Sequence, residues 1–280
     1  MYQRFLTPDF EPFDPLELAE KTLELVTRKG EYGLERKYIN FYAAPVYRGI
    51  ATGYAVGCCL RCYYCWSSWS RDFPELYGTY YSPQKAAANL VKAAQKGITT
   101  PKWKQYSRLT VEKLRISGCE PTIGKEHLLK LLECVPSEYL FILETNGILL
   151  GSDIHYVSKL AEFKEKLYVR VSFKAGTSHG FEERTGAKAE FFEVPFNALR
   201  YLLDHGIYAK AAAMTDPRIM PDYEKDILVQ KLDEIDPEAD YAQTLETERA
   251  DLYDTTVKRI QALTDPVFAE KLQEYFTSKM

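Results

Sequence analysis

The sequence predicts an α/β protein, built as a partial (β/α)6 barrel of parallel strands with an N-terminal helical extension. Two observations favour this fold. Runs rich in apolar and β-branched residues alternate with segments of helical periodicity, which is the pattern of parallel strands joined by crossover helices. Polar or small residues also follow several predicted strands, and parallel sheets place their active sites at the carboxyl ends of their strands.

The first predicted element is a helix over 15–29, where apolar residues recur at helical spacing until Gly30. An aromatic and β-branched run then predicts one strand over 38–57, which leads into a cysteine-rich loop. Later strands are predicted over 111–117, 139–145, 167–173 and 207–214, with a sixth within 238–247. Helices are predicted over 83–95, 125–134, 153–164, 191–204, 223–232, 252–263 and 266–277.

The length of 280 residues fits one large domain. We expect an N-terminal extension over 1–49, the partial barrel over 50–250, and C-terminal helices over 251–280 that pack on the barrel. The chain shows no internal repeat and no low-complexity segment.

The net charge and the cysteine content indicate which partners and which compartment are expected. A net charge of −4 argues against a nucleic acid as partner. No apolar run reaches the roughly 18 residues of a membrane span, and the N-terminus has no secretory signal pattern. Four of the 6 cysteines are clustered, which is a poor layout for a disulfide framework, so we expect a reducing cytoplasm.

The clustered cysteines are Cys58, Cys59, Cys62 and Cys65, in the run Gly-Cys-Cys-Leu-Arg-Cys-Tyr-Tyr-Cys. Read from Cys58, the spacing is C-x3-C-x2-C. Three thiolates on such a loop can hold three irons of a [4Fe–4S] cube and leave the fourth iron open. A zinc site usually needs two separated ligand pairs, and the C-x2-C spacings of this chain all lie within this one run. A bacterial ferredoxin needs C-x2-C-x2-C and a remote Cys-Pro; read from Cys59 the run has the first spacing, but the sequence contains no Cys-Pro.

This loop, placed after the first strand of a β/α pattern, resembles the C-x3-C-x-aromatic-C signature of the radical S-adenosylmethionine (SAM) superfamily, with Tyr64 as the aromatic. The resemblance implies that Cys58, Cys62 and Cys65 ligate one [4Fe–4S] cluster and that SAM binds the open iron. Reductive cleavage of SAM would then yield a 5′-deoxyadenosyl radical. It also implies an electron donor such as flavodoxin or ferredoxin. Cys59 is expected to be a bystander.

A second segment, Gly118-Cys119-Glu120-Pro121, resembles the Gly-Gly-Glu-Pro segment of the superfamily, whose backbone holds the methionyl amino group. Small residues serve that role because the backbone must approach the ligand closely. Cys119 departs from the pattern. It is either an inert, half-buried thiol or a thiol that quenches or relays a radical.

Further cofactor contacts are implied at the ends of later strands. Asn146 either lies near the nucleoside or belongs to an Asn-Gly turn. Ser172 and Lys174 would bind the ribose hydroxyls and the methionine carboxylate, unless Lys174 faces solvent. Met214 would contact adenine or pack in the core. Tyr64 is expected beside the cofactor, and Arg170 shares a strand face with Ser172.

Two composition features are open to two interpretations each. Trp66, Trp69, Phe73, Tyr77, Tyr80 and Tyr81 would form either an aromatic cover over the site or a separate hydrophobic cluster. The basic stretch over 96–115, with Trp103 and Tyr106 inside it, would meet a nucleic acid or form a solvated charged face, and we favour the latter.

The segment over 174–186 resembles the branch of pyruvate formate-lyase activating enzyme, so our first hypothesis is an activase of a glycyl radical enzyme. A second hypothesis is a radical enzyme acting on a small molecule or an RNA nucleoside. A third is a non-catalytic iron–sulfur protein that transfers electrons or binds SAM. The sequence does not specify which substrate, protein or small molecule, is used.

Overall fold

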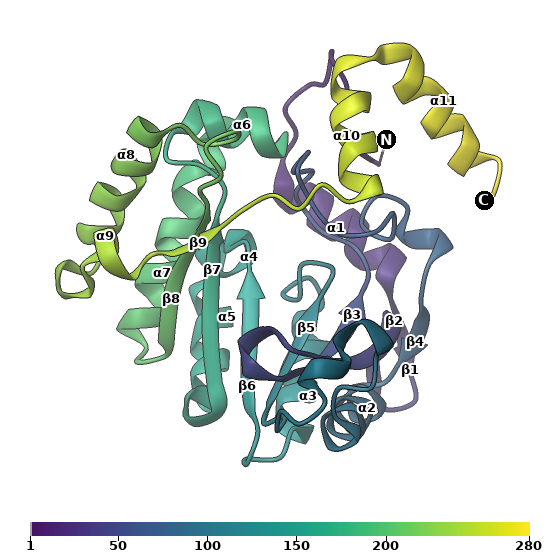
Figure 1. Ribbon diagram of the computed structural model, residues 1–280, viewed down its shortest axis with the longest axis vertical. Helices are drawn as coiled ribbons and strands as arrows, with labels where there is room; N and C mark the ends of the chain where they lie inside the picture. Colours follow the sequence, from purple (N-terminus) through teal and green to yellow (C-terminus); the bar gives the residue numbers. More distant parts are fainter. Residues whose placement is uncertain (1) are drawn as a thin grey trace.

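Residues 2–280, which the computed structural model describes, form a nine-stranded sheet with a parallel part and an antiparallel edge (Figure 1). The sheet order is β1-β2-β3-β5-β6-β7-β8-β9, and β4 pairs with β2. Every pairing from β3 to β9 is parallel, which confirms the predicted partial barrel. The parallel strands are β3 (Ile50–Ala55), β5 (Lys113–Ser117), β6 (Leu140–Thr145), β7 (Leu167–Phe173), β8 (Tyr208–Met214) and β9 (Glu246–Glu248).

Helices connect successive parallel strands. They bury apolar faces against the sheet, as Ala86, Leu90 and Ala93 of α2 illustrate. Across the described residues, no helix combines the length and apolar character needed to cross a membrane. The connecting helices are α2 (Pro83–Lys96), α3 (Lys125–Cys134), α4 (Ile148–Ser152), α5 (Ile154–Leu160), α6 (Ser178–Thr185), α7 (Val194–Asp204), α8 (Asp222–Asp233) and α9 (Tyr241–Thr244).

The N-terminal part holds a helix, as expected, and also strands that the sequence analysis did not predict. Helix α1 (Pro15–Val26) is shorter than the predicted 15–29, because β1 (Thr27–Gly30) begins where it ends. Strand β2 (Gly33–Ala44) pairs antiparallel with β1, with β3 and with the short β4 (Thr79–Tyr81). The sheet therefore extends beyond the parallel strands at this edge.

The single strand predicted over 38–57 is wrong, because the chain reverses in its middle. Strands β2 and β3 form a hairpin, and Tyr47 and Arg48 at its tip have positive φ angles of 53° and 58°. Gly49 follows with φ 107°, where a Cβ would lie 2.6 Å from the carbonyl oxygen of Thr110. Left-handed backbone at two residues other than glycine is uncommon, so the sequence carries no clear signal for this turn.

The predicted sixth strand lies later than expected. Most of 238–247 forms the short helix α9 and its flanking turns, and β9 starts only at Glu246. Its three residues pair in parallel with the end of β8. The last two helices, α10 (Asp254–Thr264) and α11 (Pro266–Thr277), form close to the predicted positions.

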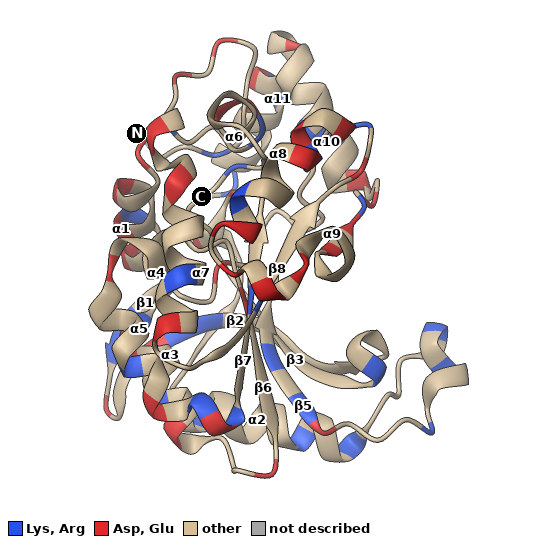
Figure 2. Ribbon diagram, turned by 90° about the vertical axis from the view of Figure 1, so that its left-hand side faces the viewer, with Lys and Arg blue, Asp and Glu red and all other residues tan. Residues whose placement is uncertain are grey.

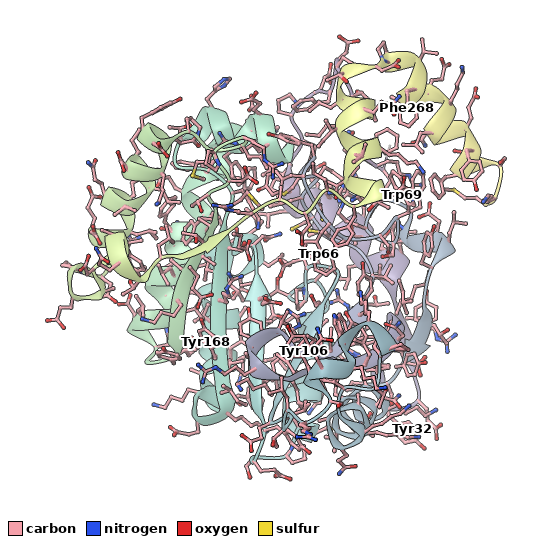
Figure 3. All side chains as sticks on the ribbon, in the orientation of Figure 1. Tyr32, Trp66, Trp69, Tyr106, Tyr168 and Phe268 are labelled. Carbon is pink, nitrogen blue, oxygen red and sulfur yellow. The ribbon has the colours of Figure 1, made fainter. Side chains whose placement is uncertain are left out.

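The aromatic stretch after the cysteine loop divides between two places. Phe73 stacks on Phe276 of α11 with ring centroids 4.1 Å apart, and Trp69 lies 5.2 Å from the same ring. These residues form a separate hydrophobic cluster under the C-terminal helices. Figure 3 shows Trp69 near Phe268 at these helices, whereas Trp66 lies closer to the middle of the molecule. The separate-cluster interpretation thus holds for this part of the stretch.

The basic stretch over 96–115 does not form one continuous face. Lys104 and Arg108 are exposed on the segment between α2 and β5, which stands away from the sheet (Figure 2). Arg115 instead lies on β5 and forms an ion pair with Glu144, with 2.7 Å between Nη1 and Oε2.

Candidate active site

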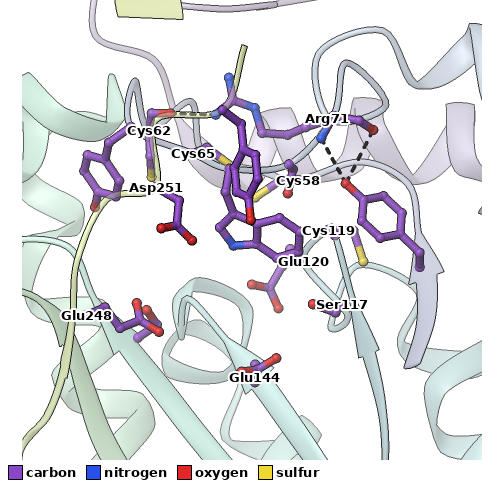
Figure 4. A pocket seen from close by; sticks show the side chains of 18 of the residues that line it. Cys58, Cys62, Cys65, Arg71, Ser117, Cys119, Glu120, Glu144, Glu248 and Asp251 are labelled. Carbon is purple, nitrogen blue, oxygen red and sulfur yellow. Dashed lines mark hydrogen bonds between the residues drawn. The ribbon is translucent and has the colours of Figure 1, made fainter. Parts of the chain in front are cut away.

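A cavity of about 770 Å³ opens at the carboxyl ends of the parallel strands. The cysteine loop, which follows β3, and the ends of β5 to β9 line it (Figure 4), together with residues of the β2–β3 hairpin, of the segment before β5 and of the start of α10. The structure brings all of the sequence-predicted site residues together here: Cys58, Cys62, Tyr64, Cys65, Gly118, Cys119, Glu120, Asn146, Ser172, Lys174 and Met214 line the cavity.

The four clustered cysteines divide between the cavity and the protein interior. Cys58, Cys62 and Cys65 line the cavity. Cys59 is fully buried and is not part of the lining. Its Sγ accepts a hydrogen bond from Nδ2 of Asn146 at 3.3 Å. The loop thus offers three sulfurs to the cavity and holds the fourth in the protein interior.

The environment favours thiolates at two of the three lining cysteines. A hydrogen bond from the thiol of Cys59 lowers the pKa of Cys58 to about 7. Burial opposes ionisation of Cys65, but the nearby guanidinium groups of Arg71 and Arg259 bring its pKa below the usual value. Burial raises the pKa of Cys62 to about 11, although Lys174 acts in the opposite direction. Because a thiolate is the metal-binding form, binding of a cation at this wall would release protons.

The donor set fits an iron–sulfur cube better than a single metal ion. Among residues 2–280, no three His, Cys, Asp or Glu side chains lie close enough to share one ion. Cysteine ligands of a [4Fe–4S] cube bind different irons, so their sulfurs stand farther apart than the ligands of one ion. Three sulfurs on one wall of a roomy cavity match the larger group.

Glu120 organises the strand ends beside the cysteine loop, where its backbone N–H donates to the Gly57 carbonyl at 2.9 Å. Its buried carboxylate accepts hydrogen bonds from the backbone N–H of Thr122 and Asn146, at 3.1 and 2.8 Å. The hydroxyls of Thr122 and Thr145 add two more, at 2.6 and 2.8 Å. The side chain therefore ties the end of β5 to the end of β6 and fixes Asn146, which in turn contacts Cys59.

Gly118 and Cys119 form the turn after β5. Gly118 has φ 82°, and a Cβ at this position would meet the Tyr54 ring at 2.6 Å, so only glycine fits. Burial raises the pKa of Cys119 to about 12, which keeps this side chain as a thiol. Its Sγ accepts a hydrogen bond from the Arg36 guanidinium at 3.4 Å.

Polar groups also reach the cavity from β7 and from the cysteine loop itself. Lys174 donates a hydrogen bond from Nζ to Oγ of Ser172 at 2.6 Å. The phenol oxygen of Tyr64 is buried and has no hydrogen-bond partner among the described residues. A buried hydroxyl without a partner is costly, and a polar ligand atom in the cavity would satisfy it.

Charged residues that were not predicted as a group also line this cavity. Arg115 and Tyr47 both donate to the carboxylate of Glu144, at 2.7 and 2.6 Å. Arg170, which the sequence offered as a further candidate, donates to Glu248 at 2.6 Å. Each of Arg115, Glu144 and Arg170 lies two positions before a residue at a strand end, so strand alternation places them on the inner face. That spacing is the signal that could have found them.

The chain is similar to a known protein family and to solved structures. The family model of the radical SAM superfamily matches residues 54–217, which is well over half of the chain. No curated protein matches. A crystal structure of SuiB from Streptococcus suis bound to S-adenosylmethionine is similar, with a TM-score of 0.52 and 15% sequence identity, over 80% of this chain and 46% of SuiB. SuiB bound to its precursor peptide SuiA gives the same TM-score and identity over 82% and 46% of the two chains.

The similarity to SuiB and the family match support different statements about this chain. At 15% identity, the similarity to SuiB shows the fold alone, and this chain spans about half of the SuiB length. The family match covers the end of β3, the cysteine loop and the strand ends through β8. Members of that family use a [4Fe–4S] cluster and SAM, in line with the cysteines at 58–65. The chain belongs to the radical SAM superfamily.

Proposed function

We propose that this chain is a radical SAM enzyme that removes a hydrogen atom from its substrate. When bound, the cluster and SAM supply a 5′-deoxyadenosyl radical. The observation that carries the proposal is the convergence of Cys58, Cys62 and Cys65 with the predicted SAM-binding residues on one cavity of about 770 Å³. In this proposal the three cysteines hold the cluster, and Cys59 stays outside the ligand set.

The remaining residues around the cavity would hold SAM. The turn at Gly118, whose φ is 82°, would present backbone carbonyl groups to the methionyl amino group. The ammonium of Lys174, beside Ser172, suits the methionine carboxylate. Tyr64 has a buried hydroxyl in need of a partner, and Asn146 and Met214 line the space where the nucleoside would lie. Cys119 would remain a neutral thiol near this group.

The substrate hypothesis has two forms. Resemblance of the segment over 174–186 to activating enzymes suggests a glycine of a partner protein. The charged lining of the cavity favours a small polar molecule instead, because Arg115, Glu144 and Arg170 offer donors and acceptors that would orient it. SuiB, which shares the fold, has been seen with a peptide, so a peptide substrate stays within the test.

The test begins with anaerobic reconstitution of the full chain, followed by SAM and dithionite. We expect 5′-deoxyadenosine from the natural sequence and none from Cys62→Ala. Absence of product from a chain that carries its full complement of iron would refute the enzyme proposal and favour the non-catalytic alternative. Deuterated candidate substrates then separate the two substrate hypotheses, since the abstracted deuterium appears in 5′-deoxyadenosine.

A further inference from the structure

Three buried arginines each donate a hydrogen bond to the backbone carbonyl of a different cavity-lining cysteine. Arg61 reaches the oxygen of Cys58 at 2.8 Å. Arg71 reaches that of Cys62 at 2.7 Å. Arg259 reaches that of Cys65, also at 2.7 Å. We call Arg61, Arg71 and Arg259 the arginine frame.

All three side chains of the arginine frame are excluded from water, with exposed fractions of 0 to 1%. Asp72, also fully buried, accepts hydrogen bonds from Arg71 Nε at 3.0 Å and from Arg259 Nη2 at 2.5 Å. Arg61 instead donates to three carbonyl oxygens, those of Gln3, Cys58 and Leu60. Asp72 is the one carboxylate paired with the frame, and the buried Glu120, which lies close enough to Cys58 to act on its pKa, adds a second negative charge. The three guanidinium groups therefore still leave positive charge in excess around the cysteine loop.

Buried positive charge of this size needs a negative counterpart, because desolvation of an unpaired ion costs several kcal/mol. Pinning the loop does not by itself require charge, since neutral donors also bind carbonyl oxygens. Thr256 of α10 does so, with its hydroxyl 3.0 Å from the same Cys65 carbonyl. The three thiolates and the cluster that they would hold provide the missing negative charge.

The frame is assembled from two distant parts of the chain. Arg61 and Arg71 belong to the loop after β3, whereas Arg259 and Thr256 lie on α10. The hydroxyl of Thr255 adds a contact to the carbonyl of Ser67 at 3.3 Å, so α10 is fastened along the loop (Figure 1). Helix α10 thus supplies one of the three positive charges.

We propose that the arginine frame sets the reduction potential of the cluster by stabilising its reduced state, with Arg259 of α10 as a positioning residue that contributes one third of the charge. The inference rests on the proposed function, because it needs a cluster on Cys58, Cys62 and Cys65. One-electron reduction by an external donor adds one negative charge to the cluster. Nearby buried cations lower the free energy of that product, and net charge and burial are known determinants of cluster potential.

The experiment is a redox titration of the reconstituted full chain without SAM, followed by the electron paramagnetic resonance signal of the reduced cluster. Arg259→Gln removes one cation, so the potential should fall by about 59 mV, a tenfold loss in the reduced-to-oxidised ratio at a fixed potential. Asp72→Asn removes the carboxylate paired with the frame, so the potential should move in the opposite direction. Thr256→Val is the matched control, because it removes a neutral donor from the same carbonyl. Its reduced-to-oxidised ratio at the same fixed potential should change by no more than about twofold.

Opposite shifts in Arg259→Gln and Asp72→Asn separate a charge effect from loosened packing, which would move both variants in the same direction. Arg259→Lys guards against misfolding, since it keeps the charge and should keep the potential. Equal potentials in all of these variants, each with a full cluster, would overturn the inference and leave the proposed function intact. Retention of the cluster by Cys62→Ala would instead overturn the ligand assignment itself.

Discussion

Asn146 and Cys59 are joined by a hydrogen bond of 3.3 Å from the amide Nδ2 to the thiol Sγ. This contact links the end of β6 to the cysteine loop and holds Cys59 in the interior while its neighbours line the cavity. The thiol in turn donates to Cys58, and this hydrogen bond together with burial raises the pKa of Cys59 well above its usual value. A neutral thiol at this position is a hydrogen-bond donor and not a metal ligand.

Replacement of Cys59 should therefore spare the cluster. We expect Cys59→Ala to retain about four irons per chain after reconstitution, whereas Cys62→Ala retains fewer. Iron analysis and the visible absorbance of the cluster provide the measurement. Loss of iron in Cys59→Ala to the level of Cys62→Ala would show that the assignment of ligands is wrong.

Gly118 should tolerate no side chain. The positive φ angle alone costs an alanine roughly 1–2 kcal/mol, and at Gly118 the added Cβ also meets Tyr54 at 2.6 Å. Gly206→Ala is the matched control, because Gly206 has φ 67° and only the Lys164 Nζ, at 4.0 Å, near its Cβ position. Urea denaturation should show a larger loss for Gly118→Ala than for Gly206→Ala, and SAM binding should weaken only in the former. Equal losses would argue against the close contact.

Lys174 should contribute binding energy for SAM without holding the cluster. Charge-assisted hydrogen bonds are worth roughly 1.5–3 kcal/mol, so Lys174→Met should weaken SAM binding about tenfold or more in isothermal titration. Iron content should stay that of the natural sequence. Lys130→Met, which changes an exposed lysine of α3, is the control and should bind SAM normally. Unchanged affinity in Lys174→Met would place the methionine carboxylate elsewhere.

His127 should make the fold sensitive to acid. Burial lowers its pKa from 6.5 to about 4, with Tyr38 and the Leu34 carbonyl as its ring partners. In the unfolded chain the imidazole takes up a proton near pH 6.5, whereas the folded chain resists it. The free energy of unfolding is therefore highest above about pH 6.5, and it decreases by about 3 kcal/mol as the pH drops to 4.

The measurement is denaturant unfolding of the cluster-free chain at several pH values between 7 and 4. His127→Gln keeps polar contacts with its neighbours but cannot titrate, so its stability should fall less steeply over this range. Identical slopes for the two proteins would exclude His127 as the source of the acid sensitivity.

The sequence predicts the parts of this site that depend on local spacing. Cys58, Cys62 and Cys65 lie on one short loop, and Ser172 and Lys174 lie at the end of a single strand, so spacing along the chain is enough to predict each group. Parallel pairing then brings the strand ends together, because the carboxyl ends of such strands share one edge. The alternation of strands and helices was therefore enough to gather the predicted residues around one cavity.

Other parts depend on contacts that the sequence does not encode locally. The β2–β3 hairpin turns at Tyr47 and Arg48, which carry no typical turn signature. The contact of Arg259 with Cys65 joins residues 194 positions apart and arises from packing of α10 against the cysteine loop. Periodicity identifies α10 as a helix, but it does not say which loop the helix will cover.

That long-range contact also bears on the order in which the site is made during synthesis. The cysteine loop leaves the ribosome early, at a time when its second half still lacks the donors on α10. Chain growth at about 5–20 residues per second separates Cys65 from Arg259 by roughly 10–40 s. A cluster inserted in that interval would lie in an open loop. This architecture is therefore suited to cluster insertion after translation is complete.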